Sequence, residues 1–342
     1  MTGHNAPMLS LWLGAYDQGL AYASLALGTY LTLRVLNFAD LTVDGSFALG
    51  GGTAAMLITQ GVPIPFALLA ALVLGSLAGT VTALIHTKLG VNDLFAGILT
   101  TTGLYTITLR LMGRSNIPIT DLNPVINLPD FGMGDDGRWA LALTVVVLGL
   151  IGLIALFLAT DFGLALRAIG NNPTMARANA IHQGLGLTIG IAAANALVAL
   201  SGALVTMYQG FADVTMGIGS LILGLGMVII GESVLRPASI RKALLAVVVG
   251  AILFRLLIAI ALQLGLEPVD LKLTTAVLLL VAMSLGHIKL PGVNASALAD
   301  GPEAAVPPQD EDQSAGTALS ADTAQSAGIA KARGPASSGE QP

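Results

Sequence analysis

The sequence predicts an all-α, polytopic helical membrane protein. Of its 342 residues, 54% are hydrophobic and only 10% are charged, whereas soluble globular domains carry about 25% charged residues. The apolar residues come in runs of roughly 20, which is the length that an α-helix needs to cross a bilayer. The 41 glycines favour close approach between helices in lipid. Too little polar surface remains to keep a core of this size in water.

Nine apolar segments are predicted to cross the membrane. They are residues 9–33, 44–60, 64–86, 92–112, 139–159, 184–209, 216–233, 242–264 and 273–290. Together they define a transmembrane domain over residues 1–290. Residues 291–342 are rich in Ala, Ser, Gly, Pro, Asp and Glu and contain no aromatic residue. Because this composition buries too little apolar surface to offset the entropy of ordering, we expect a disordered cytoplasmic tail.

The distribution of Lys and Arg predicts the orientation, because cytoplasmic connections collect these residues. With the N-terminus outside, the cytoplasmic connections hold about twice as many Lys and Arg as the outer ones, and the C-terminus lies in the cytoplasm. The cytoplasmic set is Arg34, Lys88, Arg167, Arg177, Arg236, Arg241, Lys242 and Lys289, and the outer set is Arg110, Arg114, Arg138 and Lys272.

A short motif occurs twice. Phe38–Val43 (FADLTV) returns as Phe211–Met216 (FADVTM), with four of six positions identical, and each copy precedes a short, glycine-rich apolar segment. In the predicted topology the two copies enter the membrane from opposite sides, which is typical of the inverted repeats of transporters. Chance similarity between two windows of six residues is the alternative. Gly50–Gly52, Gly224 and Gly226 predict that the short spans are broken helices.

The connection after the fifth predicted span reads as two short helices with a break between them. Gly170 fits a helix C-cap, and Asn172 followed by Pro173 fits an N-cap with proline at the first helical position. The second helix, residues 173–181, is amphipathic and too short to be stable alone in water. Two interpretations are equally compatible with the residues: a docking element for a soluble partner subunit, or an ordinary interfacial helix.

No catalytic or metal-binding motif is present. The closest match to a phosphate-binding loop is Gly226–Ser233, but Glu232 stands where that motif needs lysine to meet the phosphates. The chain has no cysteine, and no pattern of His and carboxylates has metal-ligand spacing. The sequence therefore predicts no enzyme activity, no cofactor, no metal site and no nucleic-acid partner.

The run Phe162–Ile181 (FGLALRAIGNNPTMARANAI) resembles the cytoplasmic coupling loop of permeases in the branched-chain amino acid and ribose-type ABC importer family. Residues 36–51 (LNFADLTVDGSFALGG) resemble the motif that follows the first span in that family. Together with residues 97–118 and Val228–Ser233, they look closest to a subgroup that includes tryptophan- and tyrosine-type amino acid importers. The resemblance covers about residues 10–290. Asp40–Gly45 departs from the family's usual branched-chain motif, which puts a branched-chain substrate in doubt.

The resemblance implies a permease subunit of an ATP-driven importer in the bacterial cytoplasmic (inner) membrane. It also implies partners: ABC ATPase subunits, an extracytoplasmic solute-binding protein and a second permease copy in a homodimer. The residues expected to contact the ATPase are Arg167, Asn171, Asn172, Met175 and Arg177. The alternative is a secondary transporter driven by an ion gradient, because such transporters also contain inverted repeats.

Polar residues near the short spans are the candidates for a solute path. They are Asp44, Ser46, Asn92, Asp93, Thr100, Thr101 and Thr102. For each threonine, a hydrogen bond back to its own helix is an equally good explanation. Gly75 and Gly79 form a small-residue pair that predicts helix packing rather than a path.

Ionisable residues within or at the end of apolar spans are by default functional candidates. Asp17 and Arg255 fall at similar depth in the first and eighth predicted spans, so we expect them to pair. The alternative has Arg255 extending outward to the interface and Asp17 facing water. Glu232 lies beside Arg236 at the cytoplasmic end of the seventh span, where it suits an interfacial or gate position.

Overall fold

The computed structural model describes residues 6–119 and 135–265, together with residues 273, 275–277 and 280. These residues form α1 (Ala6–Tyr30), the π-helical turn η1 (Leu31–Val35), α2 (Thr42–Thr59), α3 (Ile64–Leu89), α4 (Asp93–Met112), β1 (Asn116–Pro118), α5 (Asp135–Ala159), α6 (Asp161–Asn171), α7 (Pro173–Ala178), α8 (Gln183–Gln209), β2 (Phe211–Asp213), α9 (Ser220–Leu235) and α10 (Ile240–Gln263). The predicted all-α class is confirmed. The predicted tail, residues 291–342, lies outside the described residues.

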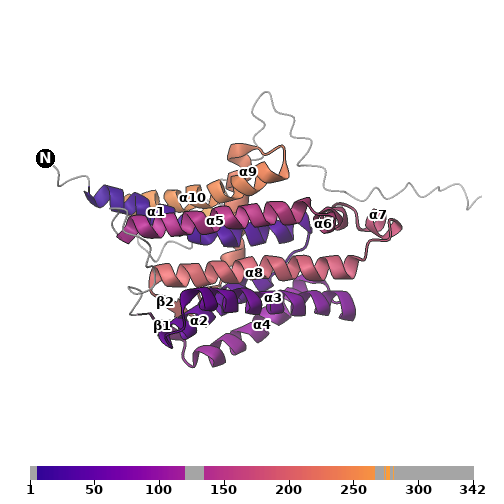
Figure 1. Cartoon of the computed structure of the whole chain (residues 1–342), viewed down its shortest axis with the longest axis horizontal. Helices are drawn as coiled ribbons and strands as arrows, with labels where there is room; N and C mark the ends of the chain where they lie inside the picture. Colours follow the sequence, from indigo (N-terminus) through magenta and orange to yellow (C-terminus); the bar gives the residue numbers. More distant parts are fainter. Residues whose placement is uncertain (1–5, 120–134, 266–272, 274, 278–279, 281–342) are drawn as a thin grey trace, which may run out of the picture. The chain divides into compact units, whose positions relative to one another are not determined.

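The long helices run side by side, with the β1–β2 pair at one end of the bundle and α6 and α7 at the other (Figure 1). The two strands are antiparallel, and Ile117 lies opposite Ala212. In a bundle that crosses a bilayer, these two ends face opposite sides of the membrane. This arrangement agrees with the prediction that residues 160–181 and the second copy of the repeated motif lie on opposite sides.

Five of the described helices are long and apolar enough to cross a membrane: α3, α4, α5 from Gly137, α8 and α10. Three further predicted spans coincide with α1, α2 and the 16-residue α9, but length and hydropathy do not place these helices among the five. Most of the ninth, residues 273–290, lies outside the described residues. A polytopic helical membrane protein is therefore supported, and the count of nine spans is not.

Helix α8 lies at the centre of the bundle, where it packs against α1, α2 and α3. Within its most apolar stretch 78% of the residues are buried, against 22% for α5. Helix α5 exposes Val145, Leu148, Leu153 and Leu156, as expected for a helix whose outer face contacts lipid rather than water.

The prediction that glycines break the short spans is wrong, because α2 and α9 are continuous helices. The glycines instead permit close contact between backbones. A Cβ atom on Gly50 would overlap the carbonyl oxygen of Ala199 in α8, and one on Gly202 would overlap that of Phe47 in α2. A helix interior tolerates glycine at a cost of about 1 kcal/mol, which tight packing between α2 and α8 offsets.

The predicted packing role of Gly75 and Gly79 in α3 is confirmed. A Cβ on Gly79 would lie 2.5 Å from the carbonyl oxygen of Ile191, and Gly75 makes a similar close approach to Ala199. Both glycines therefore let α3 lie directly against α8. This is the small-residue contact by which helices associate in membranes without a hydrophobic driving force.

Both copies of the repeated motif contain the same hydrogen bond between aspartate and the backbone two residues later. Asp40 Oδ1 accepts a hydrogen bond from the backbone N–H of Thr42 at 2.9 Å, and Asp213 Oδ1 accepts one from Thr215 at 2.8 Å. The first copy leads directly into α2. The second leads through turns at residues 214–219 into α9. This local likeness agrees with the repeat, while the inverted relation between the two halves remains a prediction.

Candidate functional site

Two capping residues shape the segment α6–α7. Thr160 Oγ1 accepts a hydrogen bond from Gly163 N at 3.2 Å and starts α6. Asn172 Oδ1 accepts one from Met175 N at 3.0 Å and starts α7, with Pro173 at the first helical position. The predicted Asn-Pro helix start is therefore confirmed. A side-chain cap of this kind contributes about 1 kcal/mol, which matters for a helix of six residues.

Two details of this segment differ from the prediction. Helix α6 continues through Gly170 to Asn171, so Gly170 is not its C-cap. A Cβ on Gly170 would overlap the carbonyl oxygen of Val35, and the glycine thus allows α6 to cross η1 closely. Helix α7 ends at Ala178 rather than Ile181, and Ala180 has a φ of 57°, which no α-helix accommodates.

All five residues predicted to contact an ATPase subunit are exposed: Arg167, Asn171, Asn172, Met175 and Arg177. Met175 is 60% exposed, and Ala176 is the buried residue of α7. The hairpin is also fixed in shape. Arg177 Nε donates to Gln183 Oε1 at 2.6 Å, and Gln183 Nε2 donates to the carbonyl oxygen of Pro173. The short helix α7 is therefore fixed in position and exposes the apolar side chain of Met175 and the cation of Arg177 to solvent.

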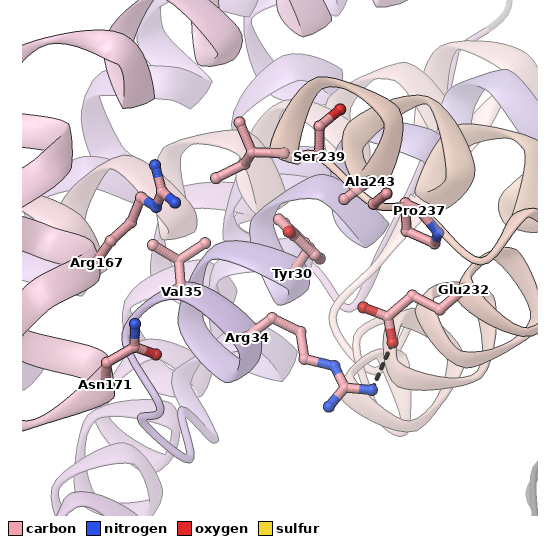
Figure 2. Close-up of a pocket in the computed structure, with 11 residues that line it drawn as sticks. Tyr30, Arg34, Val35, Arg167, Asn171, Glu232, Pro237, Ser239 and Ala243 are labelled. Atoms are coloured by element: carbon pink, nitrogen blue, oxygen red, sulfur yellow. Dashed lines mark hydrogen bonds and ion pairs between the residues drawn. The ribbon is translucent and has the colours of Figure 1, made fainter. Parts of the chain in front are cut away.

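A pocket of about 350 Å³ lies beside α6 at the same end of the bundle (Figure 2). It is lined by Tyr30, Arg34, Val35, Arg167, Asn171, Glu232, Pro237, Ala238, Ser239, Ile240 and Ala243. Arg34 Nη2 and Glu232 Oε2 form an ion pair at 2.5 Å. Glu232 thus joins the end of α1 to the end of α9. The sequence had suggested Arg236 as the neighbour of Glu232, because Arg236 is only four positions away. The contact with Arg34 could not be seen in the sequence, since the two residues are far apart along the chain.

Asp44 lies in the first turn of α2 and contacts the N-terminus of α9. Its Oδ1 accepts hydrogen bonds from Ser220 Oγ at 3.0 Å and Leu221 N at 2.9 Å, and its Oδ2 accepts one from Gly219 N at 3.0 Å. A carboxylate at this position also complements the positive end of the helix dipole. The predicted solute-path residue is therefore engaged with a helix terminus within the protein.

A buried chain of hydrogen bonds connects the segment before α2 with α8. Ser46 Oγ donates to Asn195 Oδ1 at 2.7 Å, and Asn195 Nδ2 donates to Asp40 Oδ2 at 2.6 Å. Thr42 Oγ1 lies 2.7 Å from Thr82 Oγ1 in α3. All five side chains are fully buried. Each of these five side chains has a hydrogen-bond partner, as a low-dielectric interior requires.

Our sequence interpretation named Ser46 but missed Asp40, Asn195 and Thr82. Asn195 lies in the middle of a long apolar span, and Asp40 belongs to the repeated motif. A polar residue at such depth is a signal in itself. Its partners could not be found, because Asp40 and Asn195 are 155 positions apart.

The threonines of α4 divide between the two predicted possibilities. Thr100 and Thr102 donate to the carbonyl oxygens of Ala96 and Ile98 in their own helix. Thr101 instead donates to the carbonyl oxygen of Leu41 at 2.7 Å. It therefore ties α4 to the segment that carries the first copy of the repeated motif.

The two polar residues at the start of α4 are also engaged. Asn92 is the N-cap and accepts a hydrogen bond from Leu94 N at 3.0 Å. Asp93 Oδ2 accepts one from Ala39 N at 3.3 Å. Of the predicted path residues, Asp93 and Thr101 thus contact the segment before α2, while Asp44 and Ser46 join α2 to α9 and α8. The remaining three form hydrogen bonds within α4.

Asp17 and Arg255 do not form the predicted ion pair. The guanidinium of Arg255 lies 3.7 Å from the ring centroid of Tyr22, and Tyr22 stacks on Phe47 at 5.7 Å. An aromatic face attracts a cation most strongly where water is excluded. Asp17 is buried, at 3% exposure.

These features define a helical, multi-pass membrane protein with polar groups buried between its helices. Comparison with protein families agrees: the model of the branched-chain amino acid transport system / permease component matches residues 14–284. The chain belongs to this family. It is thus the permease component of an amino acid transport system.

Two relatives cover most of the chain. A protein named tyrosine transport system permease protein, from Clostridioides difficile (strain R20291), is 36% identical over 278 residues, which are 81% of this chain and 92% of the relative. An uncharacterized protein of Rickettsia prowazekii (strain Madrid E) is 29% identical over 284 residues, or 81% of this chain and 98% of the relative. No solved structure matches this chain with significance.

Proposed function

We propose that this chain is the membrane-spanning permease subunit of an ATP-binding-cassette importer. It moves a small polar solute, an amino acid or a related compound, across the bacterial cytoplasmic membrane by alternating access. ATP hydrolysis takes place in separate ATPase subunits. A solute-binding protein delivers the solute from outside, and two copies of the permease form the translocation unit.

The observation that carries this proposal is the segment α6–α7. It exposes Met175 and Arg177 on a helix that Asn172 caps and Gln183 holds in place. Met175 and Arg177 on this short helix can offer an apolar and a charged contact to a soluble partner. Because α6 buries Leu166 and Ile169 against the bundle, a force on α7 reaches the membrane-embedded helices. A secondary transporter would not need such an element.

The solute class rests on the family and on the relative named for tyrosine transport. We propose that the solute passes the start of α2, near Ser46 and Thr101. Asp44, Asn92, Asp93, Thr100 and Thr102 position the helices around it. In the proposed orientation the N-terminus is outside and α6–α7 lies in the cytoplasm.

Site-directed labelling tests the orientation and the partner together. The chain has no cysteine, so Arg177→Cys and Arg114→Cys each introduce a single thiol at an exposed arginine. In intact cells an impermeant maleimide should modify Arg114→Cys and spare Arg177→Cys, which should react in inside-out vesicles. Bound ATPase subunits should then protect Arg177→Cys.

The importer itself is tested in liposomes that contain the permease and the ATPase subunits, with no ion gradient across the membrane. ATP with the solute-binding protein should drive uptake, and Met175→Glu with Arg177→Glu should abolish both uptake and ATPase association. Uptake that follows an ion gradient without ATP would overturn the proposal.

A further inference from the structure

We infer that the pocket beside α6 binds a zwitterionic α-amino acid on the side where the transported solute is released. This inference rests on the proposed function and deepens it. The pocket is the one shown in Figure 2, and its volume of about 350 Å³ is sufficient for a small metabolite, since ligand pockets start at about 300 Å³.

The cationic side of the pocket can hold a carboxylate. Arg167 and Asn171 project from α6 toward the pocket (Figure 2), and neither side chain forms a hydrogen bond or ion pair with a described residue. Ser239 stands at the N-cap position of α10 without capping it, so its hydroxyl is also available. A guanidinium with polar neighbours is the arrangement that recognises planar carboxylates.

The opposite side of the pocket can hold an ammonium group. Glu232 uses Oε2 for its ion pair with Arg34, and Oε1 receives no hydrogen bond from a described residue. A carboxylate can accept about four hydrogen bonds, so Glu232 can bind an ammonium group without releasing Arg34. Figure 2 shows the Arg34–Glu232 pair across the pocket from Arg167 and Asn171.

The remaining lining residues are apolar. Val35, Pro237 and Ala243 and the ring of Tyr30 form the walls, which suits a side chain that carries little charge. Both signs of charge in one small pocket favour a zwitterion over a simple anion or cation. An occupant would join α6 to α9 and to the turn before α10, so it would connect the proposed coupling segment to the helices of the bundle.

The test is protection of a single thiol in the purified permease, in nanodiscs of phosphatidylcholine. Ala238→Cys places the only cysteine on the pocket wall, and Ala178→Cys on α7 is the matched control outside it. Each of the twenty standard L-amino acids is added, and the rate of modification by N-ethylmaleimide is measured. At least one amino acid should slow modification of Ala238→Cys several-fold and leave Ala178→Cys unchanged.

The two charged groups are then tested separately. For the best amino acid, the analogue without the carboxylate and the analogue without the amino group should each protect at least about tenfold less well, as expected for losing one charge-assisted hydrogen bond. Arg167→Gln, combined with Ala238→Cys, should weaken protection by a similar factor. Arg241→Gln removes an exposed arginine that does not line the pocket and should have no effect.

Several results would overturn the inference. They are absence of protection by every amino acid, equal protection by the analogues, or protection by inorganic phosphate. Protection only in nanodiscs with anionic lipid would identify a lipid headgroup site instead. Because the assay contains no ATPase, its failure is distinct from failure of the import assay: either can fail while the other succeeds.

Discussion

The two copies of the repeated motif form the same aspartate-to-backbone hydrogen bond in two different environments. Asp40 is fully buried and shares its carboxylate between Thr42 and Asn195. Asp213, at the same position of the second copy, is partly exposed, and it accepts hydrogen bonds from both the N–H and the hydroxyl of Thr215. The shared Asp and Thr therefore form the same hydrogen bond in both places. The surroundings determine whether the aspartate holds helices together.

The largest expected effect comes from Asp40→Ala. It removes an acceptor from Asn195 Nδ2 and from Thr42 N in a fully buried site, which costs about 3 kcal/mol of unfolding free energy. Thermal unfolding of the purified protein in detergent measures this loss. Asp213→Ala is the matched control, and equal shifts of the two midpoints would contradict the comparison.

The next effect comes from Asp44, which links the two helices that follow the copies, α2 and α9. Asp44→Ala leaves Gly219 N and Leu221 N without their acceptor at the start of α9 and should cost about 1–2 kcal/mol. Asp44→Asn keeps an acceptor oxygen and should lose less. If Asp44→Ala unfolds at the wild-type midpoint, the carboxylate does not stabilise α9.

A smaller effect is expected where the two motifs carry threonine. Thr42→Val removes the hydrogen bond to Thr82 inside the bundle and should cost about 1 kcal/mol, because Thr82 retains the carbonyl oxygen of Ala78 at 3.3 Å. Thr215→Val at the exposed copy should stay within about 0.5 kcal/mol of the wild type. The same unfolding measurement compares the two, and the reverse order would be incompatible with their burial.

The smallest effect concerns pH. The hydroxyl of Thr215 holds the pKa of Asp213 below its usual value, against a weaker opposing effect of burial. Since the pKa is lower in the folded state, Asp213 stabilises the protein above its unfolded pKa of about 4, and this contribution is lost as pH falls through the folded pKa. The midpoints of wild type and Asp213→Asn should therefore converge below pH 4. Parallel pH profiles would exclude this contribution.

The sequence predicted the features that depend on neighbours in the chain. The helical class, the position of most helices, the Asn172–Pro173 helix start and the packing role of Gly75 and Gly79 all follow from composition and local spacing. Exposure of Met175 and Arg177 also agrees with the amphipathic pattern of that segment.

Features that depend on distant contacts could not be predicted. Gly50 lies within a continuous helix and allows the backbone of Ala199 to approach closely. Gly170 likewise lies within α6 and allows η1 to cross closely. Arg255 lies over Tyr22 instead of pairing with Asp17, because depth in a span does not say which way a side chain faces. In each case the deciding partner is more than 100 residues away in the sequence.

Gln183 has one further consequence. It bonds both to Arg177 and to the backbone at Pro173, and it is the first residue of α8. Asn195 follows twelve residues later, about 18 Å along the same rigid helix. We therefore expect a displacement of α7 to be transmitted along α8 as axial or rotational motion and to arrive first at Asn195, where Asp40 and Ser46 are bound.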